Sequence, residues 1–147
     1  MTARNDPVAI ALFSEIAMAE RLSRAQISKA LPKGMEISHF SVLNHLVHAG
    51  GERSPAQLAR LFHVTKGAMT NTLGKLEAAG YVHIRPDWDD ARRKFVAISP
   101  AGERARDDAV RAVAPIFDGL VQALGSDKMK AAMPFLRDLR RVLEQDI

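Results

Sequence analysis

Between residues 54 and 80, two short helix signals flank a three-residue interruption, and this arrangement restricts the fold more than any other feature of the chain. Ser54 can cap the first helix, because a Pro follows at the first helical position and Gln57 lies three residues after the cap. Thr65 can cap the second helix, which Gly80 closes. The apolar residues of that helix recur at helical spacing: Met69, Leu73 and Leu76. We therefore expect two short helices joined by a tight turn.

A β-hairpin signal follows directly. Residues 81–85 and 95–98 alternate between apolar and polar side chains, as strands with one buried face do. The intervening residues 86–94 are charged and turn-rich, and they end in three consecutive cations, Arg92, Arg93 and Lys94. A helix-turn-helix followed by such a hairpin predicts a winged helix-turn-helix over residues 38–99.

Longer helices are predicted on both sides of this core. Residues 8–31 carry apolar residues at helical spacing and end before Pro32. We expect Ser38 to cap the next helix, Ser99 to start a long helix that reaches about residue 124, and a last helix to follow Gly125. The expected buried positions of the two helices before the turn are Phe40, Leu43, Leu46 and Val47, and then Leu58, Ala59, Leu61 and Phe62. The fold class is therefore mainly α with a small β-hairpin wing, a winged helix-turn-helix core plus N- and C-terminal helices.

The terminal helices have apolar stripes that a winged core of about 45 residues is too small to cover. Their burial favours pairing with copies from a second chain about a two-fold axis. We therefore expect residues 1–147 to form a single domain in which residues 8–31 and 101–147 are dimerisation helices. The expected contributors are Ile10, Phe13, Leu120, Leu136, Leu139 and Leu143. For each of them, packing onto the chain's own core is the alternative.

The positive charge of the chain is concentrated in its middle. The 147 residues include 21 Lys and Arg against 17 Asp and Glu, a net charge of +4. Residues 54–99 contain 7 of the cations and 4 of the acids, so they carry three of the four net charges. An electrostatic attraction to the phosphates of a nucleic acid would be centred on this segment.

The helix predicted over residues 65–79 has a small, polar and basic face made of Lys66, Gly67, Ala68, Thr70, Asn71 and Lys75. Such a face can approach base edges in the major groove, where Asn pairs with adenine and Thr or Ala contacts a thymine methyl group. Taken alone, it also fits an ordinary amphipathic helix with a solvated face. The basic wing favours DNA, because an Arg in a narrow minor groove gains from the negative potential there. Asp90 can pair with Arg92 and hold it extended, whereas the alternative is an ordinary surface salt bridge.

With these motifs in view, the chain resembles the MarR family of bacterial winged-helix regulators over essentially its full length. The matching segments are Leu58-Ala59-Arg60-Leu61, Val64 to Thr70, Leu76 to Val82, Asp87-Trp88-Asp89-Asp90-Ala91-Arg92, and Val96 to Gly102. Two departures stand out. Trp88 replaces the usual wing Pro and can either stack near the DNA backbone or fold back on the wing. Gly67 and Ala68 replace hydroxyl residues, which shifts weight to Thr70, Asn71 and the wing.

The resemblance implies a homodimeric repressor that binds a palindromic operator in double-stranded DNA, with half-sites about one helical turn apart. It implies that Arg92 is the minor-groove contact, that Asp90 orients it, and that Arg93 and Lys94 add to the basic wing. It also implies a small, often aromatic and anionic effector, for which we expect a pocket lined by Phe13, His39, Phe40 and Leu43. For Phe13 and Leu43, core packing is the alternative.

Several other classes of protein receive no support from the sequence. The absence of Cys excludes disulfides, thiolate metal sites and thiol-based sensing, and no apolar stretch approaches the length of a membrane span. The N-terminus lacks the apolar part of a signal peptide, so a cytoplasmic protein without membrane contact is expected. His39, His45 and His48 suggest a metal site only weakly, because no carboxylate partner accompanies them, and no metal or cofactor is expected.

Enzymatic activity is not expected either. No nucleophile motif, phosphate loop or paired-carboxylate arrangement occurs, and Asp89 and Asp90 lie on a basic loop that is a poor place for raised carboxyl pKa values. The remaining alternative to a DNA-binding regulator is a winged-helix module that binds protein without specific DNA binding.

Overall fold

The computed structural model describes residues 5–145, which form six helices and one two-stranded antiparallel sheet. The elements in chain order are α1 (Pro7–Ala30), α2 (Ile37–Ala49), α3 (Pro55–Leu61), α4 (Lys66–Ala78), β1 (Val82–Pro86), β2 (Lys94–Ile98), α5 (Pro100–Leu124) and α6 (Ser126–Gln145). This architecture confirms the predicted fold class. The chain divides into two compact units, one that ends at Ala112 and one that begins at Val113.

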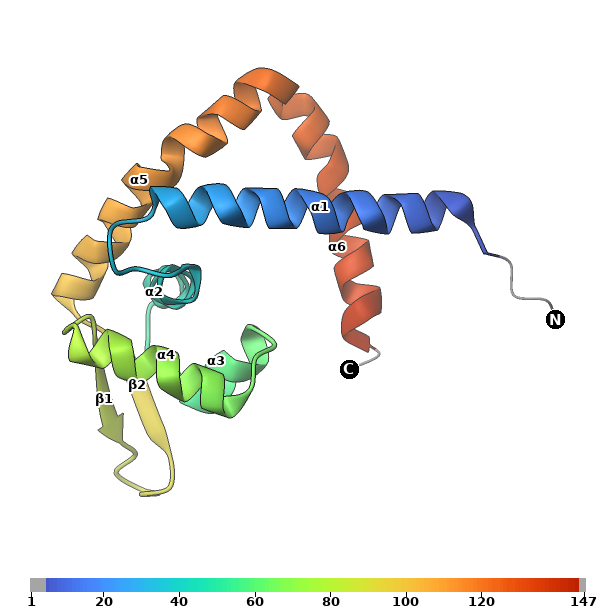
Figure 1. Ribbon diagram of the computed structural model, residues 1–147. Coiled ribbons are helices and arrows are strands. Elements are labelled where there is room, and N and C mark those ends of the chain that lie inside the picture. The colour runs from blue at the N-terminus through green and yellow to red at the C-terminus, as the bar shows by residue number, and fades with distance from the viewer. Residues whose placement is uncertain (1–4, 146–147) are drawn as a thin grey trace. The chain divides into compact units, whose positions relative to one another are not determined.

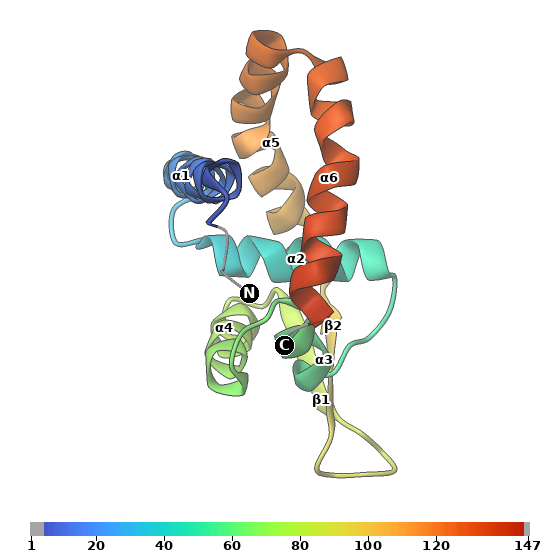
Figure 2. The ribbon, with the colours of Figure 1, turned by 90° about the vertical axis from the view of Figure 1, so that its right-hand side faces the viewer.

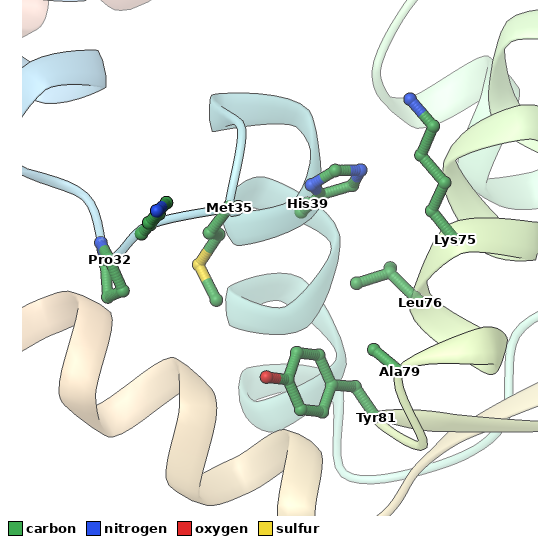
Figure 3. A pocket seen from close by; sticks show the side chains of 9 residues that line it. Pro32, Met35, His39, Lys75, Leu76, Ala79 and Tyr81 are labelled. Carbon is green, nitrogen blue, oxygen red and sulfur yellow. The ribbon is translucent and has the colours of Figure 1, made fainter.

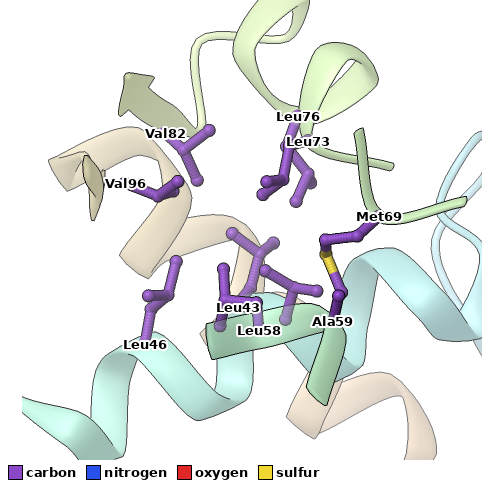
Figure 4. Close-up of a cluster of buried hydrophobic side chains, with 10 residues drawn as sticks. Leu43, Leu46, Leu58, Ala59, Met69, Leu73, Leu76, Val82 and Val96 are labelled. Carbon is purple, nitrogen blue, oxygen red and sulfur yellow. The ribbon is translucent and has the colours of Figure 1, made fainter. Parts of the chain in front are cut away.

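The core of the first unit lies where α2, α3, α4 and the hairpin meet, and Figure 4 shows its side chains converging from these elements. Its buried members are Val42, Leu43, Leu46, Leu58, Ala59, Met69, Leu73, Leu76, Val82 and Val96. Each element contributes one stripe, so the helix-turn-helix and the hairpin are held by a common set of apolar contacts. Burial of large side chains such as Leu43, which is fully buried, stabilises this arrangement by about 1.5–3 kcal/mol each.

The hairpin pairs β1 with β2 from Val82 opposite Ile98 to Pro86 opposite Lys94. Arg53 forms an isolated antiparallel β-bridge with Val96 of β2. The Arg53 N–H donates to the Val96 carbonyl, and the Arg53 carbonyl accepts a hydrogen bond from the Val96 N–H. The loop between the strands projects beyond α3 and α4 in both views of the ribbon (Figures 1 and 2). The base of the wing is therefore fixed to the core, while its tip stands clear of it.

The start of α2 differs from the prediction. The N-cap is Glu36 and not Ser38, which lies inside the helix. The Glu36 backbone N–H donates to Nδ1 of His39 over 3.0 Å, so a histidine ring occupies the position where a Glu or Gln usually closes a capping box. The buried stripe is displaced accordingly: His39 and Val42 join Leu43 and Leu46 inside, whereas the predicted Phe40 and Val47 are only half-buried.

The end of α3 holds a second difference. Leu61, predicted to be buried, is 48% exposed, whereas Phe62 is half-buried against the core. The helix ends at this point, and Phe62 as its C-cap turns inward. At 3.6 residues per turn, Leu58, Ala59 and Phe62 share one face of α3, and Leu61 lies outside that face.

Ser99 joins the hairpin to α5 as the sequence predicts, with its hydroxyl at the N-cap. Its Oγ accepts a hydrogen bond from the Gly102 backbone N–H over 3.0 Å and donates to the Gly80 carbonyl over 2.6 Å. Gly102 has no side chain because none fits: a Cβ there would lie 2.1 Å from the Tyr81 carbonyl oxygen. The first turn of α5 is thus held directly against the junction of α4 and β1.

The helices at the two ends of the chain bury little of their apolar surface. α1 begins at an Asp6 cap and contains no buried residue. In the second unit, Gly125 turns the chain with a φ of 89° between α5 and α6, and α6 also contains no buried residue. Within residues 5–145, no helix is both long enough and apolar enough to cross a membrane.

Candidate nucleic-acid interface

The helix-turn-helix is fixed by local hydrogen bonds at both helix starts. At α3, the Ser54 Oγ accepts from the Gln57 backbone N–H over 3.1 Å, and the Gln57 side chain accepts from the Ser54 N–H over 2.8 Å. At α4, the Thr65 Oγ1 accepts from the Ala68 N–H over 3.1 Å. Both caps confirm the sequence prediction, and together they set where α4 begins relative to α3.

The turn between the two helices relies on one unusual backbone conformation. His63 has a φ of 52°, in the left-handed region that few non-glycine residues adopt. The next N–H, that of Val64, returns to the Ala59 carbonyl over 3.0 Å. This closed turn holds α4 as a rigid extension of the core.

One face of α4 is buried and the opposite face is almost bare. The buried face consists of Met69, Thr72, Leu73 and Leu76. At 3.6 residues per turn, the opposite face presents Gly67, Asn71 and Gly74 with Thr70 at its edge, and all four are exposed. The backbone of α4 can therefore approach a flat or grooved partner closely, with two polar side chains available for hydrogen bonds.

The wing loop is tightly folded. The Asp87 N–H donates to the Arg93 carbonyl and the Arg93 N–H donates to the Asp90 carbonyl, each over 2.9 Å. The Asp87 carboxylate also accepts from the Asp89 N–H over 2.9 Å. The tip of the wing is consequently a set of defined turns that can present its side chains in fixed directions.

Asp90 and Arg92 form the pair predicted from the sequence. The Arg92 Nε donates to Asp90 Oδ1 over 3.1 Å, and the Arg92 backbone N–H donates to the same oxygen over 3.0 Å. The Arg92 side chain is nevertheless 91% exposed. The hydrogen bonds from the Arg92 side chain and then from its backbone lower the pKa of Asp90, so the carboxylate stays ionised. The pair directs an exposed guanidinium outward.

Trp88 lies on the surface of the wing, and its stacking near the DNA backbone stays a prediction. Its side chain is 84% exposed, and the Arg85 guanidinium lies 5.9 Å from the centre of its ring. Arg85 also lies 5.0 Å from the Phe95 ring and pairs with Glu52, whose Oε2 is 3.1 Å from Nε. Arg85 thus ties the base of the wing to the loop before α3, and Trp88 stands beside it on the surface.

A hollow of about 380 Å³ separates the wing from the two helices. It is lined by Ser54, Pro55, Ala56, Gln57, Arg60, Lys66, Thr70, Arg92, Arg93 and Lys94. Five of the ten residues predicted to bind DNA meet here, namely Lys66, Thr70, Arg92, Arg93 and Lys94. Arg60 also lines the hollow but is not among the predicted residues, because nothing in the sequence distinguishes a single Arg near the end of a short helix from a solvated side chain.

The other predicted residues of α4 lie elsewhere. Ala68 and Asn71 line a second hollow on the flank of α4 that faces α2. Lys75 lies on the same flank, with its Nζ 4.0 Å from the Glu36 Oε1. Lys75 is therefore directed toward the start of α2 and away from the wing. Gly67 lies on the outer face of α4, and Asn71 lies where this face borders the second hollow.

The residues predicted to form an effector pocket have different surroundings. Leu43 is fully buried in the core, Phe40 is half-buried, and Phe13 is 46% exposed on α1. His39 lines a cavity of about 300 Å³ in which Met35 and His39 face Leu76 and Tyr81 (Figure 3). The remaining lining residues of this cavity are Pro32, Lys33, Gly34, Lys75 and Ala79.

The three neighbouring histidines each have a structural partner. Besides the contact of His39 with Glu36, the His45 ring packs edge-on against Phe62 at 5.9 Å, and the Arg106 Nη2 lies 3.4 Å from the His48 Nε2. Burial lowers the pKa of His39, with Glu36 acting in the opposite direction and Lys75 in the same direction. In the described part of the chain, no three His, Cys, Asp or Glu residues are grouped as metal ligands would be.

Known proteins match this sequence and this fold. A sequence model of the MarR family matches residues 33–93. The HTH-type transcriptional repressor Rv2887 of Mycobacterium tuberculosis is 35% identical over 123 residues, which cover 83% of each chain. The crystal structure of the transcriptional regulator BldR from Sulfolobus solfataricus has a TM-score of 0.78 at 25% identity and covers 97% of this chain and 99% of its own.

A crystal structure of a mutant MarR from E. coli complexed with operator DNA also shares the fold. Its TM-score is 0.79 at 22% identity, over 92% of this chain and 99% of its own. The two sequence matches and the winged helix-turn-helix agree with each other. The chain therefore belongs to the MarR family of winged-helix transcriptional regulators, a family of regulators and not of enzymes.

Proposed function

We propose that this chain is a homodimeric, sequence-specific DNA-binding repressor in which α4 enters the major groove and the wing enters the adjacent minor groove. The observation that carries the proposal is the arrangement of the exposed Arg92, held by Asp90, next to the bare outer face of α4. A helix without bulky outer side chains fits a groove about 12 Å wide, and a directed Arg fits the narrower, electronegative minor groove. The mycobacterial relative is named a transcriptional repressor, which supports repression and not activation as the role of this chain.

The exposed apolar surfaces at both ends of the chain support the homodimer. In α1, Ile10 is 59% and Phe13 46% exposed, and in α6, Leu136 is 42% and Leu143 50% exposed. Soluble chains seldom leave so many large apolar side chains in contact with water unless a partner covers them. A two-fold dimer would present two copies of α4 to one duplex and so would select a palindromic operator.

Release by a small aromatic or anionic effector completes the proposal. The cavity of about 300 Å³ between the start of α2 and the end of α4 supports it, because it combines apolar walls with His39, Lys33 and Lys75. Benzoate, the simplest aromatic carboxylate, is a suitable probe. We expect millimolar benzoate to reduce operator binding by the wild type and to have less effect on Lys75→Met, which loses one cation of the cavity. If benzoate released both proteins from the operator equally, the assignment of the effector to this cavity would be contradicted.

The experiment that tests DNA binding compares Arg92→Ala with the wild type on a duplex taken from beside the protein's own gene. We expect operator affinity to fall by about 1–3 kcal/mol while the thermal unfolding curve stays unchanged. A second candidate, a module that binds protein without specific DNA binding, predicts no duplex affinity or an affinity that does not fall as salt rises. Fluorescence anisotropy with the operator and a scrambled duplex separates the two.

A further inference from the structure

The hollow between the wing and the helix-turn-helix has an unusual balance of charge. Arg60 contributes from α3, Lys66 from the start of α4, and Arg92, Arg93 and Lys94 from the wing. No Asp or Glu is among the described residues that line it. Five cations from three separate elements therefore surround one concave space of about 380 Å³.

Most of this positive charge is not compensated by ion pairs. Arg92 pairs with Asp90, and Arg93 also lowers the pKa of that carboxylate. Within residues 5–145, by contrast, Arg60, Lys66 and Lys94 form no ion pair with a carboxylate. The nearby Arg85 differs, because Glu52 neutralises it at the base of the wing. An anion is the partner that such a hollow would attract.

The position of the hollow indicates which anion it would bind. On B-form DNA, one sugar–phosphate backbone separates a major groove from the adjacent minor groove. A protein that places a helix in the first groove and a hairpin in the second must straddle that backbone. The hollow lies between those two elements, with α4 on one side and the wing on the other.

We propose that this hollow seats consecutive phosphates of the DNA strand that separates the two grooves, with Arg60 and Lys66 as contacts from the helices and Arg93 and Lys94 from the wing. This assignment rests on the proposed DNA-binding function and goes beyond it. It adds Arg60 to the DNA interface. It also distinguishes these contacts with phosphates from the contacts that Asn71 and Arg92 would make inside the grooves. Phosphate contacts fix register and supply affinity, but they carry no sequence information.

The test uses Arg60→Gln, which removes the charge and keeps most of the aliphatic side chain. Arg104→Gln is the matched control, because Arg104 is exposed on α5 and does not line the hollow. Anisotropy titrations at several salt concentrations would give the slope of log K against log salt for the operator and for an unrelated duplex of the same length. The full-length wild-type protein provides the reference.

For Arg60→Gln we expect the slope to lose about one unit per protomer. Affinity should fall by the same factor, about three- to thirtyfold, on both duplexes. Arg104→Gln should keep the wild-type slope. Lys94→Gln, from the wing side of the hollow, should repeat the effect of Arg60→Gln and covers the case in which that variant does not fold.

Two results would overturn the inference. A slope for Arg60→Gln and Lys94→Gln equal to that of Arg104→Gln would show that the hollow takes no phosphate. Weaker binding of Arg60→Gln to the operator alone, with the unrelated duplex unaffected, would show that Arg60 reads bases. In both cases wild-type binding to the operator would still support the proposed function, whereas no duplex binding by the wild type would overturn both proposals.

Discussion

Asp90 holds the guanidinium of Arg92 from two residues earlier in the chain, with Nε 3.1 Å from Oδ1 and Nη2 3.4 Å from Oδ2. The pair removes net positive charge from a surface proposed to bind DNA. Its benefit must therefore lie in direction: an Arg restricted to one orientation loses less conformational entropy on insertion into a groove.

This relationship predicts the effect of Asp90→Ala. If direction matters more than charge, the variant binds the operator more weakly than the wild type, by less than about tenfold because the pair is exposed. Asp89→Ala is the matched control, since it removes the same charge one residue away. We expect Asp89→Ala to bind as tightly as the wild type or more tightly. Equal gains in operator affinity for both variants would show that the Asp90 carboxylate only repels the DNA phosphates and does not orient Arg92.

Replacement of Gly74 by Ala is expected to raise the stability of the fold and to weaken operator binding. A Cβ at this position in α4 would meet no atom within 4 Å, so the fold does not require glycine there. Gly74→Ala should raise the free energy of unfolding by about 0.5–1 kcal/mol. The added methyl group lies on the exposed face of α4, so operator affinity should fall at the same time.

Gly119→Ala is the control for this variant, because Gly119 also lies inside a helix with open space around it, but in α5. It should gain stability without losing affinity, as measured by thermal unfolding and anisotropy. Wild-type affinity in Gly74→Ala would contradict close approach of α4 to DNA.

The ring of His39 predicts a pH dependence of stability. Its Nδ1 accepts the Glu36 N–H only when that nitrogen is unprotonated, and burial lowers its pKa below the ordinary 6.5. The unfolded chain therefore takes up a proton at a higher pH than the folded chain does. The contribution of neutral His39 is present above pH 6.5 and is lost as the pH falls toward the lowered pKa.

His39→Gln separates this effect from other titrations, because Gln can close the capping box without titrating. Urea unfolding at pH 7.5 and 5.5 should show a larger loss of stability in the wild type than in His39→Gln. The same loss in both proteins would mean that His39 does not govern this pH range.

The exposed apolar face of α6 predicts the effect of a charge on assembly. Leu136→Glu places a carboxylate among side chains that the proposed dimer would bury, so the variant should sediment as a monomer at micromolar concentration. Lys130→Glu is the control, since Lys130 is an exposed polar residue of the same helix. A Leu136→Glu variant that sediments like the control would indicate that α6 lies outside the interface.

Features set by local chemistry could be predicted from the sequence. The caps at Ser54, Thr65 and Ser99 depend on side chains within three residues of each other, and the structure has all three. The pair between Asp90 and Arg92 is equally local. The helices and strands between these points follow from the periodicity of their apolar residues.

Features that depend on tertiary neighbours could not be predicted from the sequence. Ser38 is a better cap than Glu36 by residue preference, but the His39 ring and the packing of Val42 fix the earlier start. Arg60 joins the basic hollow only because α3 and the wing meet in space. The burial of Leu43 likewise depends on the neighbours that α3, α4 and the hairpin supply, and it agrees with core packing, the alternative stated for this residue.

Hydroxyl-radical footprinting of the wild type on DNA from beside its own gene tests the central claim most directly. Two copies of α4 and the wing on one duplex predict two protected half-sites related by two-fold symmetry, with centres about one helical turn apart, and minor-groove protection at the outer edge of each. Loss of the minor-groove protection alone in Arg92→Ala would agree with this. The account would be contradicted if no protection appeared at all of the salt concentrations at which the protein stays folded. A single protected site without a symmetry-related second site would contradict it as well.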